Sequence, residues 1–337
     1  MDKLLAKYSK KTFHFKRPSG TSRGVLTEKH SWFIEVWDPT NPSIVGTGEC
    51  SVIPGLSPDF KDVQEYTAKL EETCRDLTLD LTDWPSIKFG VETALLDLQS
   101  GAKGLIFEND FYYGKRKILI NGLIWMGDED FMKKQIDEKL DAGFTTIKMK
   151  IGAIGFDAEL ALLKSIREDY SAEDITLRVD ANGAFPVNNA LEMLKRLAEL
   201  DIHSIEQPIK AGQWEEMARL CKSTPLPIAL DEELIGVNTS SDKAALLDTI
   251  QPQFIILKPS LHGGISGSKE WIELAEKRNI PWWMTSALES NIGLNAICQF
   301  NAEYNNDLPQ GLGTGSLYTD NIESNLVVKT GSIFYSS

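Results

Sequence analysis

Cysteine is scarce in this sequence, and the cysteines that are present follow no recognisable motif. There are four among 337 residues, and none has the CxxC spacing of a zinc site or a redox pair. This pattern argues against a disulfide framework and favours reduced, mostly buried thiols in the cytosol. The four residues are Cys50, Cys74, Cys221 and Cys298.

Long apolar runs and excess positive charge are also lacking. No segment approaches the roughly 18 apolar residues of a membrane span, and the polar start of the chain lacks the apolar centre of a signal peptide. The formal net charge is −14 at pH 7. Nucleic acids and anionic membranes attract positive surfaces, so we expect neither as a partner. The sequence therefore predicts a cytoplasmic protein.

The first hundred or so residues combine strand and helix patterns. Residues 32–37 are rich in β-forming side chains and end at a turn-like segment, after which the extended pattern resumes at 46–50. Helical stretches follow near 62–74 and 86–99. This part of the chain is predicted to be an α+β segment.

From about residue 117, short apolar strands alternate with amphipathic helices. In the helix expected at 129–142, for example, Met132, Ile136 and Leu140 form one apolar stripe. This alternation is typical of a parallel α/β sheet with right-handed crossovers. No GxGxxG follows the first strand, so we predict a (β/α)7β TIM-like barrel rather than an open doubly wound sheet. The expected strands are 118–123, 146–150, 176–180, 204–206, 227–230, 254–257 and 281–284.

Charged residues end five consecutive strands of this barrel. Lys150, Asp180, Glu206, Asp231 and Lys258 follow one another at intervals of 25 to 30 residues, which is one β/α unit each. They are therefore expected at the same C-terminal face of the barrel, where such enzymes place their active sites.

Three carboxylates that converge on one face repel one another unless a cation lies among them. A single acid at a strand end is more often a helix cap or a surface charge, but Asp180, Glu206 and Asp231 fall on consecutive strands in register. Oxygen ligands without His or Cys suit Mg²⁺, with Mn²⁺ as a substitute. The sequence predicts a metal site formed by these three residues.

Two lysines on the second strand face the barrel interior together. Lys148 and Lys150 are two residues apart and so share one side of their strand. Burial, a nearby cation and the second ammonium would lower the lysine pKa, so that a neutral amine could act as a base. Each lysine alone could equally be a structural salt-bridge partner. Together with Lys258 across the cavity, they favour removal of a proton α to a metal-bound carboxylate.

These motifs as a set resemble the enolase superfamily, in its muconate-cycloisomerase-like branch. The shared pattern is a KxK pair on the second strand, then Asp, Glu and Asp on the third to fifth, then Lys on the sixth. The resemblance covers nearly the whole chain. It implies an α+β capping domain at 1–115, completed by about 312–337, and a catalytic barrel at 116–311.

Within this branch, three strings favour the dehydratases of menaquinone biosynthesis. They span residues 121–124, 258–264 and 286–293. The implied reaction is loss of water from a succinyl-hydroxycyclohexadiene-carboxylate to give an aromatic ring. N-acylamino acid racemases, dipeptide epimerases and cycloisomerases on the same scaffold remain alternatives, as does a non-catalytic binding protein, although the intact lysines and acids count against the last.

The resemblance also implies a role for each residue. Lys150 would abstract the α-proton and then protonate the leaving hydroxyl, giving syn elimination. Lys148 would keep Lys150 ready to act as the base and help to hold the substrate carboxylate. Lys258 would place its ammonium over the forming ring as a cation–π partner, while the three acids bind Mg²⁺. Residues expected to contact the substrate or to support the ligands are Arg178, Asn182, Glu232, Gly263 and Ser286.

Three further segments are open to more than one interpretation. The polar segment 17–24 is expected either to cover the barrel mouth as a lid or to be an ordinary hairpin loop. His262 is expected near the rim and is not required by the mechanism. The glycines at 311–315 could mimic a phosphate-binding turn, but a tight turn back to the capping domain fits better.

Overall fold

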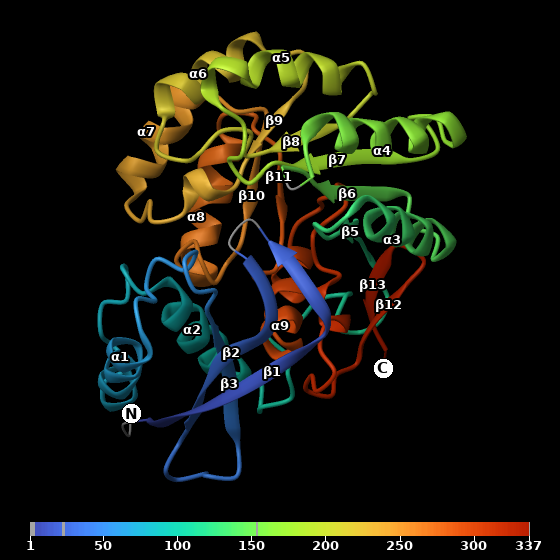
Figure 1. Ribbon diagram of the computed structural model, residues 1–337. Helices are drawn as coiled ribbons and strands as arrows, with labels where there is room; N and C mark the ends of the chain where they lie inside the picture. The colour runs from blue at the N-terminus through green and yellow to red at the C-terminus, as the bar shows by residue number, and fades with distance from the viewer. Residues whose placement is uncertain (1–3, 22–23, 153, 337) are drawn as a thin grey trace.

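The computed structural model describes residues 4–21, 24–152 and 154–336, in which an antiparallel sheet with two helices lies against a parallel α/β barrel. In Figure 1 the blue sheet lies below the green-to-orange barrel. No helix within these ranges is both long and apolar enough to cross a membrane.

The capping sheet has the antiparallel order β1-β2-β3 and separates two apolar clusters. Alternate residues of β2 point to opposite faces. Trp32 and Ile34 pack with Tyr66 of α1 on one face, whereas Phe33 packs with Leu288 of the barrel on the other. The elements are β1 (Leu5–Thr21), β2 (Gly24–Trp37), β3 (Val45–Ser51), α1 (Val63–Arg75) and α2 (Pro85–Gln99).

Helix α2 lies so close to β3 that glycine is required at the contact. A Cβ atom on Gly48 would lie 1.9 Å from the carbonyl oxygen of Gly90. The start of α2 is held by buried Asp59, whose Oδ2 accepts from Ser86 N at 2.9 Å and from Ser86 Oγ at 2.6 Å. Farther along α2, Glu92 accepts the backbone N–H of Ile265 at 2.5 Å and so caps a barrel helix. The capping domain is thus attached to the barrel through side-chain contacts as well as by packing.

The barrel contains seven parallel strands in sequence order and an eighth short segment that closes it. Gln310 bridges Ile120 and Gly311 bridges Thr285, both in parallel sense. The predicted (β/α)7β barrel is therefore confirmed. Its strands are β5 (Gly122–Ile124), β6 (Thr146–Lys150), β7 (Thr176–Asp180), β8 (Ser204–Glu206), β9 (Ile228–Leu230), β10 (Phe254–Leu257) and β11 (Trp282–Met284).

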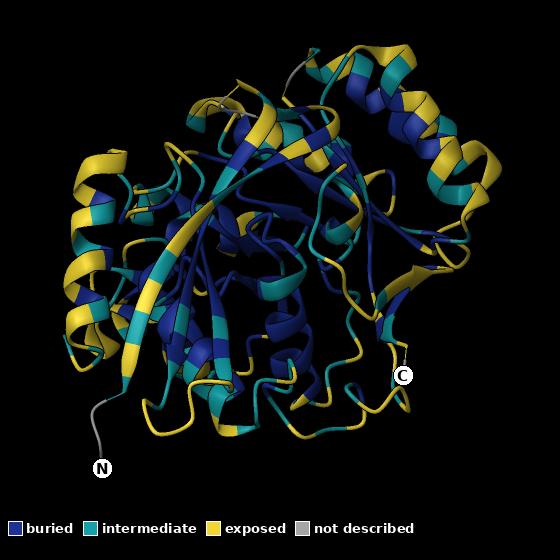
Figure 2. Ribbon diagram, turned by 90° about the horizontal axis from the view of Figure 1, so that it is seen from below, coloured by how far each residue is buried: buried dark blue, intermediate teal, exposed yellow. Residues whose placement is uncertain are grey.

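Helices cover the outside of the barrel, and their solvent-facing sides are exposed while the strands are buried (Figure 2). Helix α9 differs from the others because every residue from Gly293 to Ala302 is buried. The helices are α3 (Glu129–Asp141), α4 (Phe156–Asp169), α5 (Val187–Ala198), α6 (Trp214–Ser223), α7 (Ser240–Ile250), α8 (Gly264–Glu276) and α9 (Asn291–Ala302), with a short 3-10 turn η1 (Glu232–Leu234) after β9.

The first barrel strand differs from its expected range of 118–123. Its first part, β4 (Ile118–Leu119), pairs antiparallel with β13 (Ser332–Tyr335), which in turn pairs with β12 (Leu326–Lys329). Only β5 (Gly122–Ile124) pairs with β6, and Ile120 just before it bridges the closing segment at Gln310. An apolar run does not indicate which strand each of its halves will pair with. The expected range 118–123 therefore combined two separate strands.

The C-terminal segment contacts both parts of the protein. After the 3-10 turn η2 (Thr314–Ser316), Tyr318 bridges Phe15 of β1, whereas β12 and β13 pair beside the barrel. The division into a capping domain at 1–115 with 312–337 and a barrel at 116–311 stays a proposal.

The segment expected as a polar loop at 17–24 is mostly strand. Residues 17–21 belong to β1, with a register shift between His14 and Ser19, and β2 begins at Gly24. Residues 22 and 23 lie outside the described ranges. Gly20 bridges Met126, immediately after β5, so this end of the hairpin is attached to the barrel mouth. Motion of this segment as a lid stays a prediction.

Candidate active site

The strand register brings the predicted site residues to one level of the barrel. Lys150 pairs with Asp180, and Asp180 pairs with Glu206, on three adjacent strands. Asp231 follows β9 and Lys258 follows β10 directly. These five side chains, expected from their spacing to share one face, therefore do meet at the C-terminal ends of the strands.

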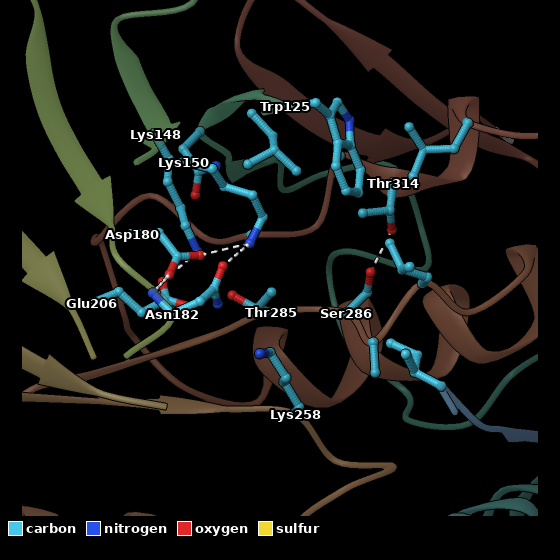
Figure 3. A pocket seen from close by; sticks show the side chains of 18 of the residues that line it. Trp125, Lys148, Lys150, Asp180, Asn182, Glu206, Lys258, Thr285, Ser286 and Thr314 are labelled. Carbon is cyan, nitrogen blue, oxygen red and sulfur yellow. Dashed lines mark hydrogen bonds and ion pairs between the residues drawn. The ribbon is translucent and has the colours of Figure 1, made fainter. Parts of the chain in front are cut away.

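Lys148 and Lys150 both contact Asp180. Lys150 Nζ lies 2.9 Å from Asp180 Oδ2 and 2.8 Å from Asn182 Oδ1. Lys148 Nζ lies 3.0 Å from the same Asp180 oxygen and also contacts a carboxylate oxygen of Glu206. Figure 3 shows both lysines above the carboxylates, with Lys258 on the opposite wall of the pocket.

The opposite wall has its own ion pair. Lys258 Nζ contacts Asp231 Oδ2, and both residues are buried. Asn182, which has a positive φ of 43°, joins the two walls because its Nδ2 donates to Glu232 Oε1 at 3.0 Å. Asn182 and Glu232 thus lie beside the acids and lysines, as their neighbouring positions in the sequence indicated.

The acids titrate unequally in this cluster. Burial and the negative charge of Asp180 raise the pKa of Glu206 to about 8. Burial would also raise the pKa of Asp180, but Lys148 and Lys150 outweigh it and hold this pKa below its usual range. Glu206 is thus the acid of the three whose charged form burial and Asp180 disfavour most.

Among the protein's own groups, the pKa of Lys148 is raised rather than lowered, and that of Lys258 is raised as well. Burial would lower both pKa values, but Asp180 and Glu206 raise that of Lys148, and Asp231 and Glu206 raise that of Lys258. Sequence reasoning counted burial and a second ammonium, but the carboxylates lie closer to each lysine.

The chemistry of the side chains suits a divalent cation with oxygen ligands, but lysines hold the acids apart. Three ammonium groups (Lys148, Lys150, Lys258) face four carboxylates (Asp180, Glu206, Asp231, Glu232), so the cluster has one more acidic than basic side chain. Asp231 Oδ1 is buried without a hydrogen-bond partner among the described residues. Within the described residues, no three Asp, Glu, His or Cys side chains lie close enough together to hold a metal ion. The Lys148 ammonium lies between Asp180 and Glu206 and contacts both.

The cluster opens into a pocket of about 1130 Å³, including its mouth, between the barrel and the capping domain. Ser286 lies on the wall opposite the lysines, where its hydroxyl contacts that of Thr314 (Figure 3). The rest of the wall is largely apolar, which suits a ring-shaped ligand whose polar groups are held at a few points. The apolar lining residues are Leu26, Ile53, Leu56, Leu123, Trp125, Phe144, Ala287, Leu288 and Leu317.

Three candidates from the sequence do not line this pocket. Arg178 is buried one layer deeper, where Nη1 donates to Pro309 O at 2.7 Å and the guanidinium lies 4.1 Å from the Trp283 ring centre. Gly263 and His262 line a separate pocket with Lys88 and Lys243. His262 is buried rather than at the rim, and its Nδ1 accepts the backbone N–H of Lys258 at 2.9 Å. Gly263 adopts φ 86°, so this position requires glycine for its backbone shape.

The glycine-rich segment 311–315 leads into the three-residue 3-10 turn η2 rather than into an α-helix. Gln310 and Gly311 are the eighth strand segment, and Gly313 and Thr314 line the pocket. Sequence reasoning also missed Thr285, Thr314 and the capping-domain residues Ile53 and Leu56. Thr285 could have been found as the residue directly after the seventh strand, but contacts across the two domains leave no local signal.

Comparisons with known proteins agree on one family and one fold. The family model described as enolase C-terminal domain-like matches residues 132–336. The chain is 48% identical to the o-succinylbenzoate synthase of Desulfotalea psychrophila strain LSv54, over 96% of this chain and 97% of that protein. The crystal structure of MenC from Desulfotalea psychrophila LSv54 is similar with a TM-score of 0.87 and 43% identity, covering 98% of this chain and 99% of that one.

A more distant structure shares the fold. It is the dipeptide epimerase from Enterococcus faecalis V583, complexed with Mg and the dipeptide L-Leu-L-Tyr. Its TM-score is 0.82 at 19% identity, and the match covers 99% of this chain and 96% of that one.

Proposed function

This chain belongs to the enolase superfamily, and from this premise we infer that it is a hydro-lyase that forms o-succinylbenzoate. The inference rests on 48% identity to an o-succinylbenzoate synthase over almost the whole of both chains. One structural observation supports it most directly: Lys150 and Lys258 approach from opposite walls of one pocket with the acids between them. The implied substrate is a succinyl-hydroxycyclohexadiene-carboxylate, a step of menaquinone biosynthesis.

We propose that Asp180, Glu206 and Asp231 bind Mg²⁺, with Mn²⁺ as a possible substitute. Their side chains are buried and follow adjacent strands, and together with Glu232 they place four carboxylates against three lysines. When bound there, the ion would withdraw electron density from a substrate carboxylate and so acidify the α-proton.

Lys150 is the base in this proposal. Its amine takes the proton α to the carboxylate, and the electron pair of that C–H bond enters the ring. The same ammonium then gives a proton to the hydroxyl on the same face, the C–O bond breaks, and water leaves as the ring becomes aromatic. Hydrogen bonds to Asp180 Oδ2 and Asn182 Oδ1 hold the amine at the pocket surface, which fixes the face from which it acts.

Lys148 and Lys258 supply fixed positive charge. Lys148 contacts both Asp180 and Glu206, so it orients these two acids. Lys258 lies across the pocket, where its ammonium can face the ring as negative charge spreads over it. Both lysines have raised pKa values and so remain charged at neutral pH.

An assay of dehydration tests this function directly. The purified chain with Mg²⁺ should convert the cyclohexadiene substrate to o-succinylbenzoate, followed by the absorbance of the aromatic product. N-succinyl amino acids, dipeptides and muconate serve as competing substrates in parallel. Faster turnover of any of these than of the cyclohexadiene would assign a different reaction to the site.

Racemisation or epimerisation is the second candidate. It is favoured by the two lysines on opposite walls, because one could remove an α-proton and the other return it on the opposite face. Deuterium exchange at the α-carbon of an N-succinyl amino acid in D₂O would reveal such activity. Retention of all the α-protium would reject it.

A further inference from the structure

Two of the sequence segments that favour the dehydratases, 258–264 and 286–293, contain residues that have no part in the proposed reaction. Ser260 follows Lys258 by two residues, and Glu289, Ser290 and Gly293 follow the pocket wall at 285–288. All lie on the side of the barrel that faces β2 and β3 of the capping sheet. Hydrogen bonds join Ser290 and Gly293 to a buried network on that sheet made of Lys29, Ser31, Glu49 and Ser51. The hydrogen-bonded pair Ser260–Glu289 is linked to this network by the attraction between the Glu289 and Lys29 charges.

Lys29 is the cation of this network, and it is only 5% exposed. Its Nζ donates to Ser31 Oγ at 3.1 Å and to Ser51 Oγ at 2.5 Å. Ser51 Oγ in turn donates to the carbonyl oxygen of Ala287 at 3.3 Å. Because Ala287 lines the catalytic pocket, a chain of two contacts joins the Lys29 ammonium to the substrate wall.

Glu49 connects the same cation to the start of α9. Ser31 Oγ donates to Glu49 Oε1 at 2.7 Å. Glu49 also accepts the backbone N–H groups of Ser290 and Gly293, at 2.9 and 3.0 Å, and the hydroxyl of Ser290. A fully buried carboxylate from the capping sheet therefore satisfies the free N–H groups of a barrel helix.

Glu289 brings a second buried carboxylate to this place. It is fully buried and accepts the Ser260 hydroxyl at 2.5 Å. Gly293 permits the approach, because a Cβ there would lie 2.7 Å from Glu289 Cγ and 3.0 Å from Glu49 Oε2. Burial raises the pKa of Glu289 and lowers that of Lys29, and the attraction between the two groups opposes both shifts.

We propose that Lys29 is a positioning residue, which, through Ser51, Glu49 and Glu289, holds the 285–288 wall and the segment after Lys258 in place for the substrate. The inference rests on the proposed function for its kinetic consequence. Its structural consequence, the order of residues 285–293, is independent of that function.

The network touches substrate-contacting segments but not Lys150. Loss of the network should therefore weaken the binding of the substrate and of the transition state about equally. Such a change raises KM more than it lowers kcat. In Lys29→Met, two buried carboxylates would lack their cation. In the double variant Lys29→Met/Glu289→Gln, only Glu49 remains charged, and the α9 N–H groups still hold it.

The test compares these variants in the complete Mg²⁺-loaded protein. Lys29→Met should raise KM for the cyclohexadiene substrate about 10-fold with kcat within about 3-fold, and the double variant should recover most of that loss. Hydrogen–deuterium exchange should be faster by about 10-fold in peptides covering 285–293 in Lys29→Met, with the remaining barrel peptides unchanged. Lys7→Met, on an exposed lysine of the neighbouring strand paired with Glu35, is the matched control and should behave as wild type.

The remaining outcomes separate the possibilities. A lowered melting temperature with unchanged KM in Lys29→Met, or a double variant no better than the single one, would show a merely structural role and overturn the proposal. If Lys29→Met does not fold, Ser51→Ala decides, because it keeps every charge and removes only the hydroxyl that joins Lys29 to Ala287. Unchanged exchange at 285–293 would then reject the proposal. If the wild type does not form o-succinylbenzoate, the proposed function fails, and the exchange data alone decide the inference.

Discussion

Asp59 gives a prediction whose size can be calculated from the structure. This carboxyl is buried at the start of α2, and burial raises its pKa from 3.8 to about 6, although Ser86 opposes the shift. An acid with a raised pKa in the folded state binds more protons when folded than when unfolded, between about pH 4 and pH 6. Its contribution to stability is therefore present at low pH and is lost as pH rises through 6.

The magnitude follows from the two pKa values. At about pH 5, the folded state should be favoured roughly 10-fold more than at pH 7.5 by this group alone, or about 1.4 kcal/mol. The full difference, reached at lower pH, is about 3 kcal/mol. Replacing Asp59 with Asn removes the titrating group but keeps an oxygen that can accept from Ser86.

The measurement is the free energy of unfolding by urea, followed by tryptophan fluorescence at pH 5 and pH 7.5. The difference in stability between wild type and Asp59→Asn should change by about 1.4 kcal/mol between these pH values, in the direction that favours wild type at pH 5. Asp141→Asn, at an exposed position ending α3, is the control and should show no such change. An Asp59→Asn difference that stays constant with pH would refute the assignment of a raised pKa.

Three further predictions concern the active site. Lys150→Ala should lower kcat by about 10³- to 10⁴-fold, because it removes the base, while circular dichroism and Mg²⁺ affinity stay close to wild type; retained turnover would assign the base to another residue. EDTA should abolish activity and added Mg²⁺ should restore it, measured in the same dehydration assay, and full activity in chelator would remove the metal from the proposal. Asp180→Asn should weaken Mg²⁺ binding, measured by calorimetry, by at least about 10-fold. The melting temperature should change little, because Lys148 still contacts Glu206 and Lys150 still contacts Asn182. A large loss of stability with intact Mg²⁺ affinity would contradict this.

The positions of the acids and lysines could be predicted because they depend on a single repeat. Each β/α unit returns the chain to the same face, so Lys150, Asp180 and Glu206 at the ends of adjacent strands must lie side by side, and the register confirms it. The bounds of β6, β7, β8 and β10 also matched the expected ranges, since buried parallel strands are short apolar runs with clear ends.

Depth within the barrel and contacts between domains could not be predicted in this way. Arg178 shares the side of its strand with Asp180, but it lies one layer deeper against Trp283, and alternation alone cannot distinguish these layers. The pKa direction of Lys148 depends on the distances to two carboxylates, which spacing does not provide. Ile53 and Leu56 line the pocket only because the capping domain packs on the barrel.

The closing segment at 310–311 bears on how the chain reaches its native state during synthesis. Gln310 and Gly311 are joined to their neighbours on both sides by backbone hydrogen bonds, and the Gln310 side chain also accepts from Met284 N and Asn301 Nδ2. Until these two residues leave the ribosome, β5 and β11 remain the open edges of a curved sheet, with unpaired backbone groups that other chains can bind. Nascent chains that stop just before Gln310 should therefore aggregate, whereas those that extend through the C-terminal hairpin can complete the cylinder.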